Sequence, residues 1–418
     1  MRVLQVIGAM DRGGAETMLM NAYRAMDRSR VQFDFLVHEQ RVCDYDEEIE
    51  SLGGRVYRAL PRFTGLNGAA YRKAVRAFLA QHPEHEVVHG HIGSSAVIYL
   101  GEAKRAGRVA VAHSHAQNYP LSAGELAFRA LSYPVRFKAD YFLACSEQAG
   151  IDRFGRAVVE GERFHVLRNG IDVAAFACTD EQHRQAKQEL CDRLGIDGQA
   201  GGEAGSVAGD GSQKLVLVGH VGRFDPVKNH RFLVETFTQV KHDVPAAHLL
   251  LVGRGPEEAA IREQVRAAGL ESSVHFLGVT DDVPAVLHGL DAFVLPSFRE
   301  GLSMAAVEAQ ATGVPCVLSD GVPDEAILPG TPVARISLAD GLHVWATAIG
   351  EAARIGAGPA WPAEASAGGA EPAEAVASEQ PGAYDRILGA EAARGAGYDI
   401  HDTACWLQEF YERIAPAR

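Results

Sequence analysis

The sequence lacks the features that mark a membrane-spanning or disulfide-bonded protein. No stretch of about 18 or more uncharged apolar residues occurs, so no segment is expected to cross a membrane. The N-terminal apolar run is too short for a signal peptide, and no cleavage-site pattern follows it. The six cysteines are scattered without a CxxC pair, which favours reduced thiols over disulfides or a zinc site. We therefore expect a cytoplasmic protein.

Two familiar nucleotide-binding fingerprints are also missing. The glycine-rich turn from Gly8 to Gly14 is not followed by Lys-Ser or Lys-Thr, so it is not a P-loop. Its spacing is not GxGxxG, which leaves a nicotinamide-dependent dehydrogenase with little support. The net charge of −14 argues against nucleic acid as a partner. What the turn does offer is glycines before a helix, where backbone N–H groups can approach an anion.

What the sequence has is a repeated alternation of short apolar runs and amphipathic helical stretches. Apolar runs without polar alternation indicate strands covered on both faces, as in a parallel sheet. The first series of expected strands comprises Arg2–Ile7, Gln32–Val37, Val87–His89, Val109–His113, Tyr141–Ala144 and Phe164–Leu167. The second series comprises Lys214–Val221, His248–Val252, Val274–Leu277, Ala292–Leu295 and Pro315–Leu318. With 418 residues, 47% of them hydrophobic, the chain is predicted to form two doubly wound α/β domains.

Two segments interrupt this pattern. Residues 197–213 are rich in Gly, Ala and Ser, which is typical of a flexible insertion. Residues 355–380 contain few large apolar side chains and cannot bury enough surface to offset the entropy of ordering. The predicted organisation is a first domain over 1–175, a linker helix and flexible insertion over 176–213, a second domain over 214–354, a low-complexity insertion over 355–380, and a C-terminal helical segment over 381–418.

One stretch of the first domain carries charge of a single sign. Between Ser51 and Pro83 there are six basic residues and no acidic one. The simpler interpretation is a solvated helix face. The functional interpretation is a patch that faces anionic lipid headgroups or an acceptor diphosphate. Both interpretations stay open at this point.

Two basic residues follow the first expected strand of the second domain. Gly222, Arg223 and Lys228 flank a tight turn indicated by Asp225-Pro226. Ligands of open α/β sheets bind at the carboxyl ends of the strands. A guanidinium and an ammonium converging on a diphosphate could neutralise the charge of a leaving group. The alternative is an exposed turn with ordinary surface cations.

The strongest signal follows the strand that ends at Leu295. Two carboxylates, Glu300 on a loop and Glu308 about two turns into a helix, could accept hydrogen bonds from the hydroxyls of a sugar and a ribose. The amides of Gly301 and Leu302 at the helix start could hold phosphate. Two glutamates on a solvated helix are the commoner case in isolation. Here their position favours a donor-sugar site.

Four histidines form two H-x-H pairs near strand ends, His89 with His91 and His113 with His115. A metal site is conceivable. No nearby Asp, Glu or Cys completes the set, so we expect no metal. His115 is better explained as a polar group beside the sugar or the acceptor, and His113 as a structural residue.

Together these motifs resemble glycosyltransferase family 4. The matching residues are Gly13-Gly14-Ala15-Glu16, His113-Ser114-His115, Arg168 to Asp172, Arg223 to Lys228, Gly278 to Val283, and Glu300 with Glu308. The resemblance covers most of the chain outside the two insertions, and it is nearest to the bacterial exopolysaccharide and capsule branch. It implies the GT-B architecture, in which two Rossmann-like domains face each other across a cleft. It also implies that the C-terminal helix, over 401–416, packs back on the first domain.

The resemblance further implies a role for each motif residue. His115 would lie beside the transferred centre, Arg223 and Lys228 would stabilise the departing nucleotide, and Glu300 would hold the sugar hydroxyls. The implied donor-binding residues are Gly13, Gly14, Gly222, Val279, Ser297, Gly301, Leu302 and Glu308. The family retains anomeric configuration, uses no cofactor, and needs no divalent metal because protein cations replace it.

The resemblance leaves the substrates broad. The expected donor is a UDP-, GDP- or ADP-sugar, and the expected acceptor is a glycan or a lipid-diphosphate-linked saccharide. The basic stretch over 51–83 would provide peripheral contact with an anionic membrane. A nucleotide-sugar 2-epimerase or hydrolase of the same architecture stays open as an alternative. A non-catalytic carbohydrate-binding protein would not need Arg223, Lys228 and Glu300 together.

Overall fold

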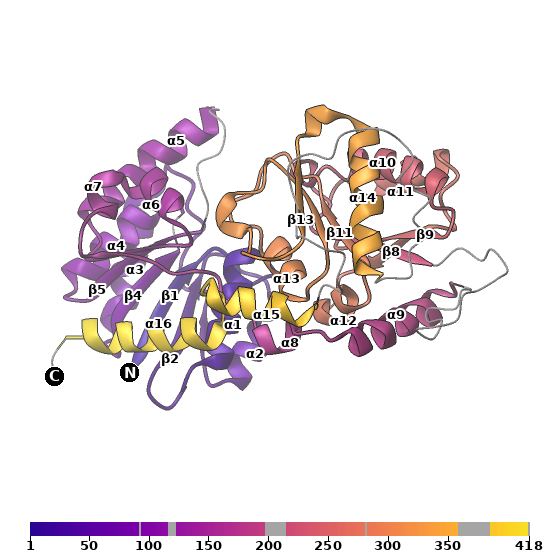
Figure 1. Cartoon of the computed structure of the whole chain (residues 1–418). Helices are drawn as coiled ribbons and strands as arrows, with labels where there is room; N and C mark the ends of the chain where they lie inside the picture. The colour runs from indigo at the N-terminus through magenta and orange to yellow at the C-terminus, as the bar shows by residue number, and fades with distance from the viewer. Residues whose placement is uncertain (92, 116–122, 197–214, 281, 358–384, 417–418) are drawn as a thin grey trace. The chain divides into compact units, whose positions relative to one another are not determined.

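The chain folds as two α/β units. The computed structural model describes residues 1–91, 93–115, 123–196, 215–280, 282–357 and 385–416 (Figure 1). The first unit comprises residues 1–172 and 397–418, and the second comprises residues 173–396. Each unit contains one parallel sheet with helices packed on it, so the predicted class of two doubly wound α/β domains is confirmed.

The first unit contains a seven-stranded sheet in the order β3-β2-β1-β4-β5-β6-β7. Its strands are β1 (Arg2–Ile7), β2 (Gln32–Val37), β3 (Val56–Tyr57), β4 (His85–His91), β5 (Val109–Ser114), β6 (Tyr141–Ala144) and β7 (Phe164–Val166). Its helices are α1 (Gly14–Ala25), α2 (Asp46–Ser51), α3 (Gly68–Gln81), α4 (Ala96–Arg105), α5 (Ala123–Ser132), η1 (Tyr133–Phe137), α6 (Glu147–Phe154), α7 (Arg156–Val159) and α16 (Ile400–Ile414). The strand order reverses between β1 and β4, which is where doubly wound sheets bind ligands.

Successive residues of β1 enter two different cores, as expected for a strand covered on both faces. Val3 packs in the core that includes Phe410 of α16, whereas Leu4 and Val6 pack in the other core. The C-terminal helix α16 therefore covers one face of the first sheet, and Figure 1 shows it in yellow beside the indigo strands. Burial of its apolar stripe, rather than proximity in sequence, holds α16 there.

The second unit repeats this arrangement with a six-stranded sheet in the order β10-β9-β8-β11-β12-β13. Its strands are β8 (Val216–Val221), β9 (Ala247–Val252), β10 (Val274–Gly278), β11 (Ala292–Leu295), β12 (Cys316–Ser319) and β13 (Val333–Ile336). Its helices are α8 (Val173–Phe176), α9 (Asp180–Leu194), η2 (Pro226–Lys228), α10 (His230–Asp243), α11 (Glu258–Ala267), α12 (Val283–His288), α13 (Met304–Ala311), η3 (Asp324–Ala326), η4 (Leu338–Asp340), α14 (Leu342–Gly356) and α15 (Ile387–Gly395).

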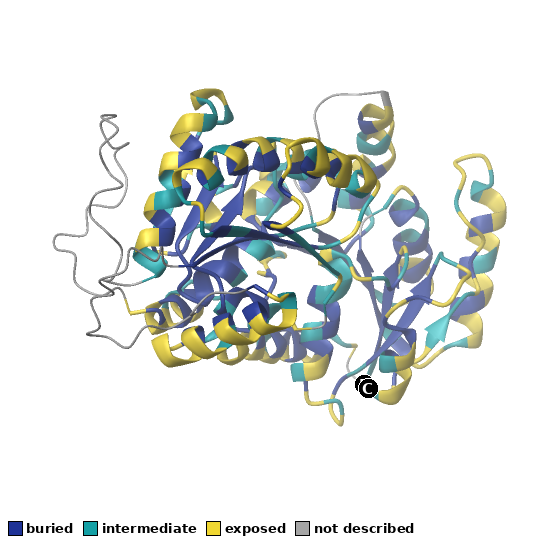
Figure 2. Cartoon of the chain, turned by 90° about the vertical axis from the view of Figure 1, so that its right-hand side faces the viewer, coloured by how far each residue is buried: buried dark blue, intermediate teal, exposed yellow. Residues whose placement is uncertain are grey.

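Burial follows the layers of each unit. The central strands are buried along most of their length, while the helices bury one side and expose the other (Figure 2). Parallel sheets need this double cover because their strands are apolar on both faces. None of the helices described here is long and apolar enough to cross a membrane.

The expected linker helix, α9, belongs to the second unit. Its Lys187 is buried, and its Nζ lies 2.7 and 2.9 Å from the carboxylate oxygens of Asp291, just before β11. Although burial alone raises the pKa of Asp291, the Lys187 ammonium and His183 together outweigh it and hold that pKa well below its usual range. A helix fixed by a buried ion pair is part of the domain rather than a connector.

The two expected insertions coincide largely with the residues that the structure leaves undescribed. Residues 197–213 lie outside the described residues, as do residues 358–380. The start of the second insertion was predicted too early, because α14 continues to Gly356. Its last turn contains Ala352 and Ala353, which are buried small residues, so a composition poor in large apolar side chains did not end the helix.

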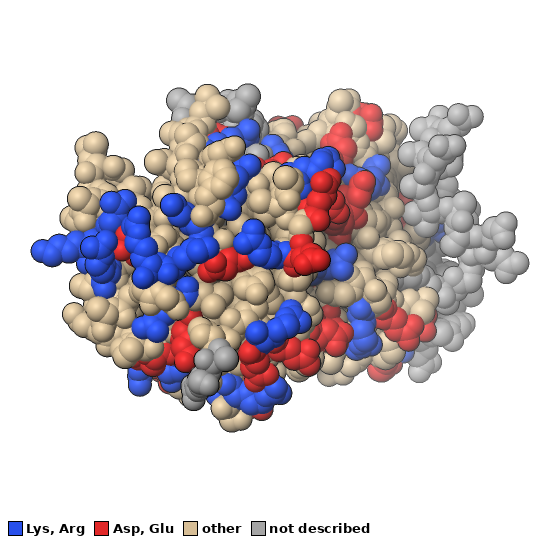
Figure 3. All heavy atoms as spheres, turned by 90° about the vertical axis from the view of Figure 1, so that its left-hand side faces the viewer, with Lys and Arg blue, Asp and Glu red and all other residues tan. Residues whose placement is uncertain are grey.

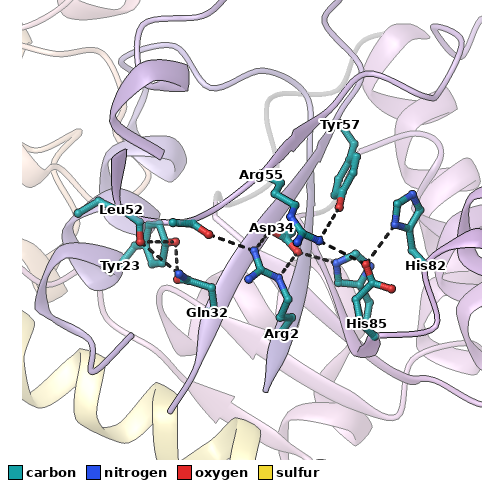
Figure 4. A network of polar contacts seen from close by, with 11 residues as sticks. Arg2, Tyr23, Gln32, Asp34, Leu52, Arg55, Tyr57, His82 and His85 are labelled. Carbon is teal, nitrogen blue, oxygen red and sulfur yellow. Dashed lines mark hydrogen bonds and ion pairs between the residues drawn. The ribbon is translucent and has the colours of Figure 1, made fainter. Parts of the chain in front are cut away.

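A buried polar network ties the amino-terminal ends of three strands in the first unit (Figure 4). Asp34 of β2 is fully buried and accepts hydrogen bonds from Arg2 Nε at 2.6 Å and from His85 Nε2 at 2.8 Å. Although burial raises the pKa of this carboxyl, the hydrogen bonds from Arg2 and His85 outweigh it and lower the pKa to about 2. The network fixes β1, β2 and β4 at the end of the sheet remote from the glycine turn.

Candidate active site

The loops that follow β8 and β11 meet where the strand order of the second sheet reverses. Asp225 Oδ1 accepts a hydrogen bond from the Val227 amide at 3.1 Å and so caps the short turn that ends in Lys228. Lys228 Nζ donates to Glu300 Oε1 at 2.7 Å, and the two side chains are 18% and 9% exposed. The fold thus pairs the cation and the carboxylate that the sequence singled out separately.

Backbone hydrogen bonds hold these loops together. The Phe298 amide donates to the Val227 carbonyl at 2.9 Å, and the Glu300 amide donates to the Gly321 carbonyl at 2.9 Å. A Cβ atom at Gly321 would lie 2.6 Å from the carbonyl oxygens of Ser297 and Phe298, so no side chain fits there. The position of Glu300 is therefore set by its neighbours and not by a free loop.

Glycine is also required beside Arg223. A Cβ atom at Gly253, whose φ is 136°, would lie 2.1 Å from the Gly222 carbonyl oxygen. This close approach places the loops after β8 and β9 in direct contact. Arg223 is exposed, and its guanidinium makes no hydrogen bond or ion pair within the described residues. It is a cation available to a ligand near Lys228.

Two buried hydroxyl groups near the start of α13 lack partners. Ser297 is fully buried and Ser303 is 2% exposed, yet neither Oγ atom has a hydrogen-bond partner in the described part of the chain. A buried polar atom without a partner costs about 1–3 kcal/mol, so each hydroxyl has an unused capacity to donate a hydrogen bond. Gly301 and Leu302, both partly exposed, precede the helix. Ser303 escaped the sequence analysis, although a serine at a helix N-cap was a usable signal.

Glu308 lies in the middle of α13 and makes no side-chain hydrogen bond or ion pair within the described residues. Although the residue is only partly covered from solvent, burial of its carboxyl group raises its pKa to about 7. Its oxygens are free to accept hydrogen bonds from a ligand's hydroxyls. Val279, which is 47% exposed, follows β10 at the same carboxyl edge of the sheet.

In the first unit, Gly13 and Gly14 begin α1. Gly13 is the N-cap with extended backbone, and Gly14 is exposed with no atom within 4 Å of the position of a Cβ. The carboxylate of Glu16 folds back over Gly13, where a Cβ would lie 2.3 Å from its Oε2. Burial raises the pKa of Glu16. The open backbone at Gly14 lets a ligand approach the first amides of the helix.

His115 lies next to other histidines of the first unit. Its Nε2 is 2.6 Å from Nδ1 of His91, and the three buried residues His89, His91 and His113 bring ring nitrogens within 4.8 Å of one another. Burial lowers the pKa of His115 to about 4, so its ring is neutral near pH 7. The structure therefore groups His115 with a histidine cluster that sequence reading treated as two separate pairs.

The predicted site residues divide between the two units. Gly13, Gly14 and His115 belong to the first unit, and all the others belong to the second. Within the second unit, the sequence located the paired residues Lys228 and Glu300, and it missed the hydroxyl of Ser303.

A doubly wound unit with cations, a carboxylate and unpartnered hydroxyls at its switch point is suited to an anionic, hydroxyl-rich ligand. The chain belongs to glycosyltransferase family 4. The family model described as Glycosyltransferase Family 4 matches residues 12–175, and the model described as Glycosyl transferases group 1 matches residues 216–353. The first model spans the strands of the first sheet from β2 to β7, and the second spans all six strands of the second sheet. The protein is a glycosyltransferase with the GT-B fold.

Similar proteins agree with this assignment. EpsF of Bacillus subtilis, named as a glycosyltransferase, is 37% identical over 85% of this chain and 88% of its own length. The UDP-Gal:alpha-D-GlcNAc-diphosphoundecaprenol alpha-1,3-galactosyltransferase of Escherichia coli is 33% identical over 24% of this chain and 26% of its own length. HepE of Anabaena, solved with UDP-glucose, has a TM-score of 0.71 at 19% identity and covers 99% of this chain and 100% of its own.

Proposed function

We propose that this glycosyltransferase moves a sugar from a nucleoside diphosphate donor to a glycan or lipid-diphosphate-linked acceptor, with retention of anomeric configuration. The reaction would serve bacterial exopolysaccharide or other cell-surface polysaccharide synthesis. Relatives support the two substrate classes, since HepE was solved with UDP-glucose and the Escherichia coli relative is named for a UDP-sugar donor and a lipid diphosphate acceptor. UDP-, GDP- and ADP-sugars are the donors to test.

One observation carries the proposal: the Lys228–Glu300 pair at the ends of β8 and β11. Lys228 offers an ammonium to the donor diphosphate, and Glu300 offers a carboxylate to hydroxyls of the sugar. A site that must bind a sugar and its diphosphate together needs both chemistries within one side-chain length. Arg223 adds a second cation, and the amides of Gly301 and Leu302 add neutral donors.

The proposed mechanism follows from these groups. The bond between the anomeric carbon and the diphosphate oxygen breaks, and negative charge develops on the departing nucleotide. Arg223 and Lys228 stabilise that charge. The departing phosphate accepts the proton of the acceptor hydroxyl, whose oxygen forms the new glycosidic bond on the same face. No carboxylate is assigned as a covalent nucleophile.

The remaining donor contacts are part of the same proposal. Glu308 accepts hydrogen bonds from the ribose, and the backbone near Val279 contacts the base. Ser297 gives its unpartnered hydroxyl to the donor. In the first unit, Gly14 approaches the diphosphate together with Gly13, and His115 lies beside the sugar.

The transfer step would need no cofactor and no divalent metal. The supporting argument is charge: Arg223 and Lys228 supply two positive charges where a metal-dependent enzyme would use a cation. A Cβ atom at Gly222 would lie 2.9 Å from His220 Nε2 and 3.5 Å from Lys228 Cδ, so glycine leaves room for the Lys228 side chain. Transfer in the presence of a chelator is the direct measurement, and complete loss of turnover that Mg²⁺ restores would contradict this part.

Peripheral contact with an anionic membrane through the basic stretch over 51–83 is a separate part of the proposal. Arg58 pairs with Asp46, and both Arg72 and Arg76 lie within 3.5 Å of Glu102, so carboxylates already face much of this charge. Figure 3 shows basic side chains gathered at the left of the face it presents, and basic and acidic side chains mixed over the rest. Sedimentation with vesicles of anionic and neutral lipid tests the contact, and equal binding to both would contradict it.

Two experiments test the function. Thermal-shift screening of UDP-, GDP- and ADP-sugars should find at least one that stabilises the chain, followed by transfer assays on lipid-linked acceptors. The substitution Arg223→Ala should remove about 2–4 kcal/mol of transition-state stabilisation. Arg231→Ala is the matched control, because Arg231 pairs with Glu257 on the outside of the same unit. Wild-type transfer by the Arg223 variant would refute the assignment.

An assay with the donor and no acceptor distinguishes a transferase from a 2-epimerase or a hydrolase. A 2-epimerase or a hydrolase would convert the nucleotide-sugar without an acceptor, giving an epimer or free sugar. A transferase should form glycoside only when acceptor is present. Efficient conversion of donor alone would favour the alternatives.

A further inference from the structure

Four histidines of the first unit meet on one face of its sheet. The parallel register sets His91 of β4 opposite His113 of β5. Because side chains alternate along a strand, His89 shares the face of His91, and His115 continues the face of His113. The ring centroids of His89 and His113 are 5.2 Å apart, and those of His113 and His115 are 4.0 Å apart.

Three of these residues bring ring nitrogens close together, and His89 and His113 each keep at least one nitrogen without a hydrogen-bond partner in the described residues. His89 and His113 are fully buried and His91 is 7% exposed, and one nitrogen of each lies within 4.8 Å of the others. Neither nitrogen of His113 has a hydrogen-bond partner in the described part of the chain, and neither has Nε2 of His89. Each buried polar atom left unpaired costs about 1–3 kcal/mol. Several at one point indicate a ligand that accepts lone pairs.

The opposite nitrogens of two rings are held by other side chains. His91 Nε2 lies 3.0 Å from Gln5 Oε1, and His89 Nδ1 lies 2.5 Å from the hydroxyl of Tyr411. Gln5 Nε2 in turn donates to Tyr411 at 3.2 Å. Because an amide oxygen only accepts, His91 carries its proton on Nε2 and keeps a lone pair on Nδ1. Metal-bound histidines are oriented in this way by partners on their second nitrogen.

We propose that His89, His91 and His113 together bind one divalent transition-metal ion, with zinc as the ion that fits best. Three imidazoles with an open fourth position are a donor set that zinc uses in proteins. Bonds of about 2.0–2.1 Å in a tetrahedral site separate the ligand nitrogens by about 3.3 Å, so modest side-chain rotation closes the set. His115 Nε2 lies 2.6 Å from His91 Nδ1, so an ion bound to that nitrogen would displace this contact.

From the sequence we expected no metal here, because each H-x-H pair alone offers two ligands and no nearby Asp, Glu or Cys completes the set. The strand register supplies the third.

The three proposed ligands belong to the first unit and are not among the donor-binding residues of the proposed function, although they adjoin His115, which that function places beside the sugar. The experiment uses the full, tag-free chain, stripped with a chelator and titrated with Zn²⁺ by calorimetry. We expect one tight zinc site per chain and a melting temperature that rises with free zinc. Co²⁺ in place of zinc should give a visible spectrum of nitrogen coordination without a thiolate charge-transfer band. No zinc binding, or a cobalt–thiolate band, would overturn the proposal.

Substitutions test which side chains bind the zinc ion. His113→Phe should fold, because His113 loses no hydrogen bond, and it should weaken zinc binding at least about 100-fold. Tyr411→Phe should weaken it about 10–100-fold by freeing the ring of His89. His82→Gln is the control, since His82 belongs to a separate, partly exposed histidine and glutamate group. Unchanged zinc affinity in the His113 variant, or loss of the site in the His82 variant, would overturn the assignment.

Discussion

Lys228 and Glu300 form a 2.7 Å ion pair between loops that are 72 residues apart in the sequence. The pair occupies the switch point of the second sheet, and both side chains are mostly withdrawn from solvent. In the proposed reaction the two residues have different roles: Lys228 binds the diphosphate, and Glu300 binds the sugar hydroxyls. This division makes their substitutions distinguishable.

Glu300→Gln should therefore lower the rate of sugar transfer more than it lowers the affinity for the nucleotide. We expect kcat/KM for transfer to fall about 100-fold, by analogy with the loss of one preorganised group. Affinity for the free nucleoside diphosphate should hold or increase, because a negative charge beside Lys228 is removed. Calorimetry with UDP, GDP or ADP and steady-state kinetics measure the two effects. Glu257→Gln is the control, and equal losses in nucleotide affinity and rate would contradict the division.

Glu308 should make donor binding depend on pH near neutrality. Its pKa of about 7 means that it loses its charge as the pH falls below 7, while the proposed ribose contact needs the carboxylate. We expect KM for the donor to rise between pH 7.5 and about 6, and Glu308→Gln to remove this dependence. A pH profile of KM for both chains provides the measurement. A donor KM that stays flat in the wild-type chain would count against the ribose contact.

The same carboxyl should influence stability with the opposite sign to an ion-paired acid. Its folded pKa lies above the unfolded value of about 4.3, so the folded chain binds more protons between these pH values. Stability from this group is therefore lost as the pH rises from about 4 to 7. The melting temperature of Glu308→Gln minus that of the wild type should therefore be larger at pH 8 than at pH 5. Scanning calorimetry at both pH values reads this out, and a constant difference would argue against a raised pKa.

Much of the fold could be predicted because burial leaves a clear pattern. Strands such as Arg2–Ile7 and Ala292–Leu295 were located to the residue, since both faces of a central strand are apolar. The edge strands β3 and β13 were not predicted. β3 has only two residues, and β13 mixes buried and exposed positions, so neither gives a continuous apolar run.

The site was harder to predict because its geometry depends on register and on contacts distant in sequence. The motifs identified Lys228 and Glu300, but only the neighbouring positions of β8 and β11 showed that they pair. The histidine set likewise depends on the register that sets His91 opposite His113. The unpartnered hydroxyl of Ser303 is a property of packing, which no spacing in the sequence contains.

Asp34→Asn should destabilise the first unit in a pH-dependent manner. Removing the charge of one partner of a buried pair costs about 3–5 kcal/mol. Asparagine keeps a single acceptor oxygen and adds an NH2 group beside Arg2 and His85, which both donate to the carboxylate. The folded pKa of Asp34, about 2, lies below the unfolded value of about 3.9. Its contribution is thus fully present above pH 4 and lost as the pH falls toward 2. Urea unfolding at pH 7 and pH 3 should show the variant's deficit shrinking.

The matched control for Asp34 is an exposed pair. Glu181→Gln breaks the ion pair with Arg184, whose side chain is 54% exposed, and should change stability by at most about 1 kcal/mol. If both substitutions cost the same, the buried network would not be the source of the effect.

Gly321→Ala should impair transfer without unfolding the protein. The added Cβ would lie 2.6 Å from the carbonyl oxygens of Ser297 and Phe298, so the loop carrying Glu300 must shift. Misplacement of a binding group by about 1 Å can cost on the order of 100-fold in rate. Gly350→Ala is the control, since a Cβ there meets nothing within 4 Å and alanine favours the α14 helix by about 1 kcal/mol. We expect kcat/KM to fall only in the Gly321 variant, with both chains showing wild-type circular dichroism. Full activity in the Gly321 variant would mean that the loop position does not govern the reaction.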